Sequence, residues 1–158
     1  MKIENITDSY IKNIINWKYP YPYDVYNFPT LEKIKEQNWG IVNPDKEKEF
    51  YCITANEKIL AFFRVQRYEN YQLLSLGVCP EECGKGKGAD IVKQMLLFMF
   101  QTSNKKIKLY VLPFNKRAIK CYTKLGFEII KTLKREVLNN EVIYIEMELC
   151  YEKFENIK

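Results

Sequence analysis

The chain has 158 residues, of which 47% are hydrophobic and 28% charged, and this length and composition indicate one globular domain with a core of its own. It contains no histidine, which excludes a Ser-His-Asp or Cys-His catalytic device and a histidine-ligated metal. Its net charge is +5.

The cysteines and the hydropathy pattern indicate a cytoplasmic protein. Five cysteines are present and no C-x-x-C pair occurs, so we expect free thiols in a reducing compartment, with no disulfide framework and no metal site. No apolar run is long enough to span a membrane, and Met1–Ile6 is strand-like and lacks the apolar block of a signal peptide.

The excess positive charge lies entirely in the second half of the chain. Residues 80–158 contain 15 basic and 10 acidic side chains, whereas residues 1–79 contain ten of each. An excess of positive charge in one half of the chain suggests a partner that carries phosphate, either a nucleic acid or an anionic cofactor. Only four of the 25 basic residues are arginine, the residue on which specific nucleic-acid readers depend. A lysine-rich solvated surface is therefore favoured over nucleic-acid binding.

The first half of the chain is predicted to contain both helices and strands. Met1–Ile6 predicts a strand, and Thr7 or Asp8 can cap a helix that runs to about Trp17. Two prolines exclude a regular helix or a central strand in the aromatic stretch 17–26. A short helix is expected next, and then three strands, at Leu31–Gln37, Phe50–Ala55, Ile59–Tyr68 and Gln72–Val78.

The second half predicts crossovers followed by a hairpin. The expected elements are a buried helix, a strand, a helix ended by Gly126 and two hairpin strands, at Ala89–Gln101, Lys106–Val111, Asn115–Leu125, Phe127–Glu136 and Val142–Leu149. We expect the hairpin to turn at Asn139–Asn140. Alternation along its last strand predicts four inward side chains, Ile143, Ile145, Met147 and Leu149, and three outward ones, Tyr144, Glu146 and Glu148. This order gives an α/β or α+β fold with a mixed sheet.

A glycine-rich loop is the strongest local signal. It follows a strand, opens a helix and reads Cys83, Gly84, Lys85, Gly86, Lys87, Gly88 and Ala89. Glycines allow successive backbone N–H groups to converge on an anion, and the helix N-terminus and two lysines add positive charge. No Ser or Thr follows as a P-loop requires, and no acidic residue ends the next strand as a dinucleotide-binding fold requires. The loop therefore predicts a pyrophosphate cradle, with a simple connecting turn as the alternative.

A second motif makes the family resemblance specific. Residues 115–127 have the pattern N-x-x-A-x-x-x-Y-x-x-x-G-F, and residues 76–88 resemble an acyl-CoA loop of the form [QR]-x-x-G-x-[GA]. Together the two segments closely resemble the GNAT superfamily of N-acetyltransferases. The resemblance covers about residues 50–149. Cys83 departs from the family pattern, because it stands where many members have Gln or Arg.

The resemblance implies a fold and a cosubstrate site. It implies a mixed, mostly antiparallel sheet of about seven strands flanked by helices and splayed between the fourth and fifth strands, with Gly77 suited to a bulge. Acetyl-CoA would be the cosubstrate. The Leu76 N–H would polarise the thioester carbonyl, the Val78 backbone would pair with the pantetheine arm, and the loop Cys83–Ala89 would hold the pyrophosphate.

The second motif implies the remaining site residues. Asn115 would contact the pantetheine arm as well as cap its helix, Ala118 belongs to the same cofactor-binding motif, and Tyr122 would serve the departing thiolate as general acid. The alternative for Tyr122 is a core residue in an amphipathic stripe. No general base is assigned; the carboxylates considered are Asp24, Glu81, Glu82 and Glu128.

We therefore expect a single acetyltransferase domain over residues 1–158, with an acceptor-side region at 1–49 and an acetyl-CoA-binding core at 50–149. The acceptor would be a small-molecule amine or a peptide N-terminus, and the protein a monomer or homodimer away from membranes. The aromatic segment 17–28 either lines the acceptor pocket or is a loop pinned to the core. The alternative function is a non-catalytic module with the same fold that binds CoA or a nucleic acid.

Overall fold

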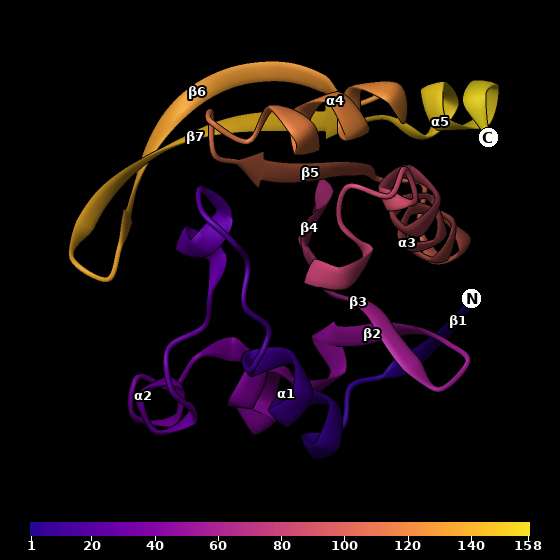
Figure 1. Cartoon of the computed structure of the whole chain (residues 1–158). Coiled ribbons are helices and arrows are strands. Elements are labelled where there is room, and N and C mark those ends of the chain that lie inside the picture. Colours follow the sequence, from indigo (N-terminus) through magenta and orange to yellow (C-terminus); the bar gives the residue numbers. More distant parts are fainter. The chain divides into compact units, whose positions relative to one another are not determined.

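The computed structural model describes all 158 residues and contains one seven-stranded sheet with strand order β1-β2-β3-β4-β5-β7-β6 (Figure 1). The strands are β1 Lys2–Asn5, β2 Phe50–Ala55, β3 Lys58–Arg67, β4 Tyr71–Val78, β5 Lys106–Val111, β6 Glu128–Val137 and β7 Asn140–Leu149. The α-helices are α1 Asp8–Ile15, α2 Leu31–Glu36, α3 Gly88–Thr102, α4 Lys116–Lys124 and α5 Tyr151–Ile157. The pairing is antiparallel apart from the parallel ladder of β4 and β5, which confirms the expected fold class.

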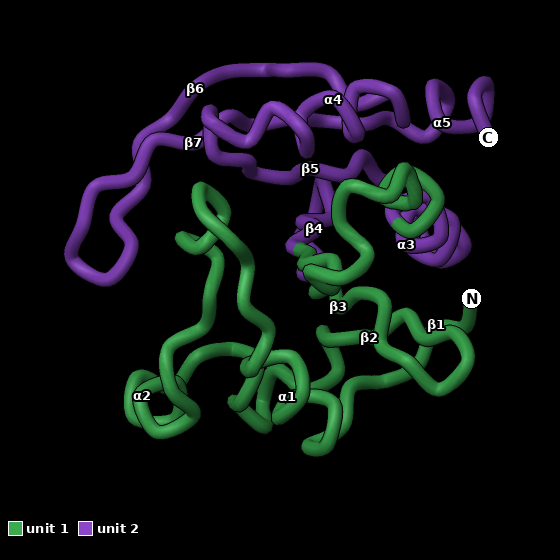
Figure 2. The backbone as a smooth tube through the Cα atoms, in the orientation of Figure 1, with its two compact units in different colours: residues 1–64, 76–91 green, residues 65–75, 92–158 purple.

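The chain divides into two compact units, each described below by itself (Figure 2). Unit 1 comprises residues 1–64 and 76–91, and unit 2 comprises residues 65–75 and 92–158. The boundary therefore passes through β3, β4 and α3.

Unit 1 is built on β1, β2 and the start of β3. The Thr7 side chain accepts a hydrogen bond from the Tyr10 N–H and so begins α1, as predicted. Four 3₁₀ turns join the elements, at Tyr23–Tyr26, Gly40–Val42, Pro44–Glu49 and Pro80–Glu82. The core cluster of this unit consists of Ile6, Ile14, Ile15, Trp17, Ile34, Ile41, Phe50 and Cys52. The aromatic segment contributes Trp17 to this cluster, which supports the interpretation that it is pinned to the core.

Unit 2 is built on β5 and the β6–β7 hairpin. Three of the four β7 side chains predicted to face inward lie opposite apolar residues of β5. The pairs are Ile145 with Val111, Met147 with Leu109 and Leu149 with Ile107. The unpredicted helix α5 packs its Phe154 ring against Phe100 of α3, with ring centroids 5.2 Å apart. The parallel ladder of β4 and β5 has three pairs and ends at Leu73 and Lys108, although both strands continue. This short ladder fits the splay implied by the resemblance.

Three details of the hairpin prediction were wrong. The turn is formed by Leu138 and Asn139, which have positive φ values of 50° and 66°, and Asn140 already belongs to β7. Ile143 is 47% exposed, because β5 pairs with β7 only as far as Ile145 and the hairpin extends beyond it (Figure 1). Glu146 is only 4% exposed, because it lies opposite Tyr110 and within 3.7 Å of the Lys108 ammonium group.

Candidate functional site

The residues singled out in the sequence form two groups, one in each unit. Unit 1 holds the end of β4 and the whole glycine loop, and unit 2 holds α4 with its cap. The first group comprises Leu76, Val78, Cys83, Gly84, Lys85, Gly86, Lys87, Gly88 and Ala89, and the second comprises Asn115, Ala118 and Tyr122.

The end of β4 directs two backbone amides away from β3. The Cys79 N–H donates to the Leu60 carbonyl of β3 over 2.8 Å. Because the main-chain groups of successive strand residues alternate in direction, the amides of Leu76 and Val78 point away from β3. This is the direction that a thioester and a pantetheine arm paired with β4 require, so the backbone fits the roles expected of both residues.

Gly77 is required by the ring of Phe62. A Cβ built on Gly77 would lie 2.5 Å from Phe62 Cε1, closer than real Cβ contacts come. The Phe62 ring also contacts the rings of Trp17 and Phe28, whose centroids each lie 5.9 Å from its own. The aromatic segment therefore packs on β4 through Phe62.

A second contact joins the aromatic segment to β4. The Tyr19 hydroxyl donates to the Val78 carbonyl over 2.7 Å, and the Cys83 thiol approaches the same oxygen at 3.7 Å. The Asn27 side chain accepts from the Tyr19 N–H over 2.7 Å and so fixes the segment near Tyr19. Sequence patterns gave no sign of the Tyr19–Val78 contact, because 59 residues separate the partners.

The glycine loop presents a run of backbone donors without protein acceptors. Gly84 and Gly86 both have φ +75°, a conformation that side chains rarely adopt. No backbone N–H from Gly84 to Asp90 donates a hydrogen bond within the protein, and the first intrahelical bond of α3 runs from Ile91 to the Lys87 carbonyl. Orphan donors at a helix N-terminus are the backbone groups that bind phosphates.

The backbone N–H of Cys83, which was expected to belong to the pyrophosphate cradle, already has an acceptor within the protein. Its N–H is already bonded to the Pro80 carbonyl over 3.2 Å, so its backbone closes the preceding turn rather than adding a donor to the cradle. Its thiol instead approaches Val78. The absence of the family's Gln or Arg at this position therefore leaves the donors of residues 84–90 unaffected.

Glu82 holds both lysines of the loop. Its Oε1 lies 3.7 Å from the Lys85 ammonium, and its Oε2 lies 3.4 Å from the Lys87 ammonium. The two lysines are thus less free than the sequence suggests, since a bound phosphate has to compete with this carboxylate.

In unit 2 the predicted cap and stripe of α4 are both present. The Asn115 side chain accepts from the Ala118 N–H over 3.1 Å, which confirms its role as helix cap. Tyr122 is only 9% exposed and lies against Phe127, with ring centroids 5.9 Å apart. Gly126 ends the helix with φ +97°, and a Cβ there would meet Ile157 and Leu149 at 3.0 and 3.1 Å.

None of the four carboxylates considered as a general base is distinguished by its surroundings. Asp24 and Glu81 are exposed, Glu82 pairs with two lysines, and Glu128 pairs with Lys153. The structure contains no group of three or more acidic or thiol side chains placed to hold a metal ion. None of its helices has both the length and the apolar character needed to cross a membrane.

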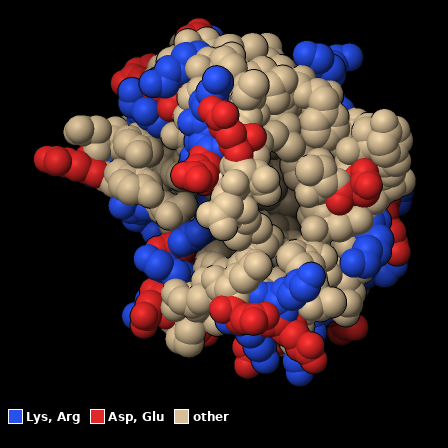
Figure 3. Space-filling model, turned by 90° about the vertical axis from the view of Figure 1, so that its left-hand side faces the viewer, with Lys and Arg blue, Asp and Glu red and all other residues tan.

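Charge on the molecular surface is mixed. The face shown in Figure 3 carries lysine and arginine side chains interleaved with aspartate and glutamate around broad uncharged areas. Many of the lysines are paired with carboxylates, as Lys106 and Lys108 are with Glu148 at 3.3 Å each. The interleaving favours a solvated surface over a nucleic-acid interface.

The seven-stranded sheet with its parallel β4–β5 ladder and its flanking helices has the architecture of an acyltransferase. Residues 10–127 match the model of the Acetyltransferase (GNAT) family, and the chain belongs to that family. It is therefore an acyltransferase enzyme, as the sequence resemblance implied.

Solved structures with this fold include three N-acetyltransferases. The aminoglycoside N(6')-acetyltransferase of Legionella pneumophila shares 18% identity, with 99% of this chain and 95% of that one covered and a TM-score of 0.77. The spermidine N-acetyltransferase of Vibrio cholerae, in complex with CoA and spermine, shares 17% identity over 98% of both chains at a TM-score of 0.74. The ribosomal-protein-S18-alanine N-acetyltransferase of Escherichia coli shares 20% identity, with 95% of this chain and 93% of that one covered and a TM-score of 0.67. A search of curated proteins found no match.

Proposed function

We propose that this protein transfers an acetyl group from acetyl-CoA to a primary amine by direct attack, within a single acetyltransferase domain. The observation that carries the proposal is the run of seven unpaired backbone donors from Gly84 to Asp90 at the start of a 15-residue helix. These donors suit the pyrophosphate of CoA, and Lys85 and Lys87 supply charge beside them.

The chemistry asks for two contributions from the chain. The Leu76 N–H, directed away from β3, would stabilise the oxyanion that forms when the amine attacks the thioester carbonyl. The carbon–nitrogen bond forms, the carbon–sulfur bond breaks, and the attacking nitrogen loses a proton to water. Tyr122 would donate a hydrogen bond to the departing thiolate. Full proton transfer is slightly uphill, because a free tyrosine has a pKa of about 10 and a thiol about 8.5.

The acceptor is proposed as a small amine or a peptide N-terminus. The solved structures with this fold carry names that specify spermidine, an aminoglycoside and an alanine of ribosomal protein S18, each as the target of N-acetylation. Their identities to this chain do not choose among these classes, so a test needs one compound of each. Spermidine, kanamycin and a peptide beginning with alanine form a suitable panel.

The test is a thiol-release assay with that panel, followed by Tyr122→Phe on the best acceptor. We expect the variant to lose at least tenfold in turnover with little change in acetyl-CoA affinity, since the hydroxyl acts only as the thiolate leaves. Tyr21→Phe is the matched control, because that side chain is 88% exposed. An unchanged rate in Tyr122→Phe would reject the role of Tyr122, and no thiol release from any amine would reject the proposed acceptor class.

A further inference from the structure

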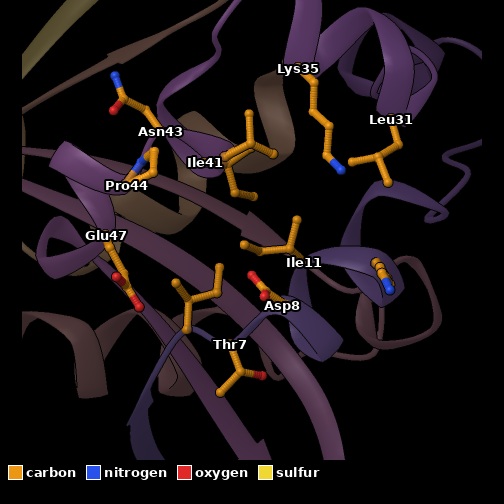
Figure 4. A pocket seen from close by; sticks show the side chains of 12 residues that line it. Thr7, Asp8, Ile11, Leu31, Lys35, Ile41, Asn43, Pro44 and Glu47 are labelled. Atoms are coloured by element: carbon orange, nitrogen blue, oxygen red, sulfur yellow. The ribbon is translucent and has the colours of Figure 1, made fainter.

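A cavity of about 390 Å³ lies in unit 1, apart from every residue of the glycine loop (Figure 4). It opens to solvent and is lined by residues of α1, α2 and the two 3₁₀ turns Gly40–Val42 and Pro44–Glu49. Its volume is at the lower end of the range of about 300–1,000 Å³ that small-molecule sites have. A small organic molecule is therefore the size of ligand that it fits.

The floor of this cavity is aliphatic and fixed. Ile6 and Ile41 are 4% and 7% exposed and belong to the core cluster of unit 1. Ile11 and Leu31 pack against the same cluster from α1 and α2 and also line the cavity. An apolar group of a bound ligand would pack against these side chains, whose positions are fixed by their packing in the core.

Four charged side chains surround the aliphatic floor without pairing. Figure 4 shows the Lys35 side chain reaching inward from α2, with the carboxylates of Asp8 and Glu47 across Ile11 and Ile41 from it. Lys12 lines the cavity from α1. None of these four makes an ion pair in the structure, whereas the neighbouring Glu49 pairs with Arg64 at 2.6 Å.

The arrangement selects the ligand's chemistry. A simple amine would leave both lysines without a partner, and a fatty acid would leave both carboxylates without one. A molecule with an ammonium group, a carboxylate and a short aliphatic body offers a partner to each of these four exposed charged side chains and to the aliphatic floor. We propose that the cavity binds a free aliphatic α-amino acid, its ammonium toward Asp8 and Glu47 and its carboxylate toward Lys12 and Lys35. The proposal concerns binding alone and uses none of the residues proposed to hold acetyl-CoA.

The first test is calorimetric titration of the wild-type protein with three compounds of one shape. L-Leucine has both charges, leucinamide lacks the carboxylate and N-acetylleucine lacks the ammonium. We expect saturable binding of leucine and at least tenfold weaker binding of each of the other two. No saturable binding of leucine, or equal binding of all three, would overturn the proposal. Leucinamide also imitates a peptide N-terminus, so tighter binding of leucinamide would overturn it in favour of a peptide ligand.

Two variants then test the placement of the charges. Lys35→Gln should weaken leucine binding at least fivefold while leaving the weak leucinamide binding unchanged, and Glu47→Gln should weaken both compounds. Lys33→Gln and Glu36→Gln are the matched controls, since both side chains are exposed on α2 and neither lines the cavity. Leucine binding that none of these four variants alters would show that it binds elsewhere and overturn the proposal.

Discussion

The hydroxyl of Tyr19 donates a 2.7 Å hydrogen bond to the carbonyl of Val78, and this contact joins the aromatic segment to the strand that carries two of the proposed cofactor residues. Trp17 and Phe28 add ring contacts with Phe62, the side chain that faces Gly77 of the same strand. The aromatic segment is thus part of the packing around the end of β4. The segment contacts the candidate site at two residues of β4: Tyr19 bonds Val78, and the Phe62 ring on which the segment packs faces Gly77.

Tyr19→Phe removes the hydroxyl and leaves the ring in place. We expect the free energy of unfolding to fall by about 1 kcal/mol, the usual net value of one such hydrogen bond. For a chain of this length, that loss lowers the melting temperature by roughly 2–4 °C. Urea denaturation and a thermal scan measure both quantities. Tyr21→Phe should change neither, and equal stability of Tyr19→Phe and wild type would contradict the role given to the hydroxyl.

Gly77→Ala tests the contact between Phe62 and β4. The added Cβ meets Phe62 Cε1 at 2.5 Å, so the ring has to move against Trp17 and Phe28. We expect a loss of about 1–3 kcal/mol in the free energy of unfolding, typical of overpacking. Phe62→Leu in the same chain should restore part of that loss, which a double-mutant cycle by urea denaturation measures. Strictly additive losses would show that the two residues do not clash.

Glu82→Gln tests the competition for the loop lysines. Because Glu82 pairs with both Lys85 and Lys87, its neutral form should leave them free for phosphate. We expect acetyl-CoA to bind roughly two- to fivefold more tightly, an effect in the range of partly exposed ion pairs, and the gain to shrink as salt is added. Glu81→Gln removes the same charge from an exposed neighbour and controls for net charge. Equal affinities of the two variants would mean that Glu82 does not restrain the lysines.

The five free thiols should differ in reactivity with pH. Burial raises the pKa of Cys52 to about 12, so at pH 8 only about one molecule in 10⁴ carries its thiolate, the reactive form. Burial also raises the pKa of Cys121 and Cys79. Native alkylation with iodoacetamide, read by peptide mass spectrometry, should label exposed Cys150 first and leave Cys52 unlabelled as pH rises from 7 to 9. Early labelling of Cys52 would show that the core around it opens.

The order of strands and helices was predictable because most elements obey their local pattern. The strand at Lys106–Val111 has the predicted bounds, and Thr7 and Asn115 cap helices as their positions indicated. The hairpin turn shifted by one residue because Leu138 and Asn139, rather than Asn139 and Asn140, adopt positive φ. Periodicity places Glu146 outside, but only the pairing of β5 with β7 shows Lys108 and Tyr110 beside it.

The site was predictable as far as the backbone carries it. The glycine pattern predicted a special backbone over residues 84–88, where Gly84 and Gly86 have positive φ, and the position of Asn115 predicted a helix cap. Burial of Tyr122 agrees with the alternative that helical spacing offered, and its catalytic role stays a prediction. The Tyr19–Val78 bond and the clash between Gly77 and Phe62 depend on tertiary contacts that no local pattern encodes. The cavity beside α1 and α2 was missed for the same reason, since its four charges come from three separate elements, α1, α2 and the turn Pro44–Glu49.

The most direct test of the account is calorimetric titration with acetyl-CoA and with free CoA. Wild type should bind both in the micromolar range, because the phosphate and pantetheine contacts are common to the two. Gly86→Glu should abolish binding by placing a carboxylate among the free donors, whereas uncharged Gly86→Asn, which tolerates φ +75° and meets no atom within 4 Å of its Cβ, should retain part of it. Wild type that binds neither compound, or Gly86→Glu that binds as wild type does, would contradict the account.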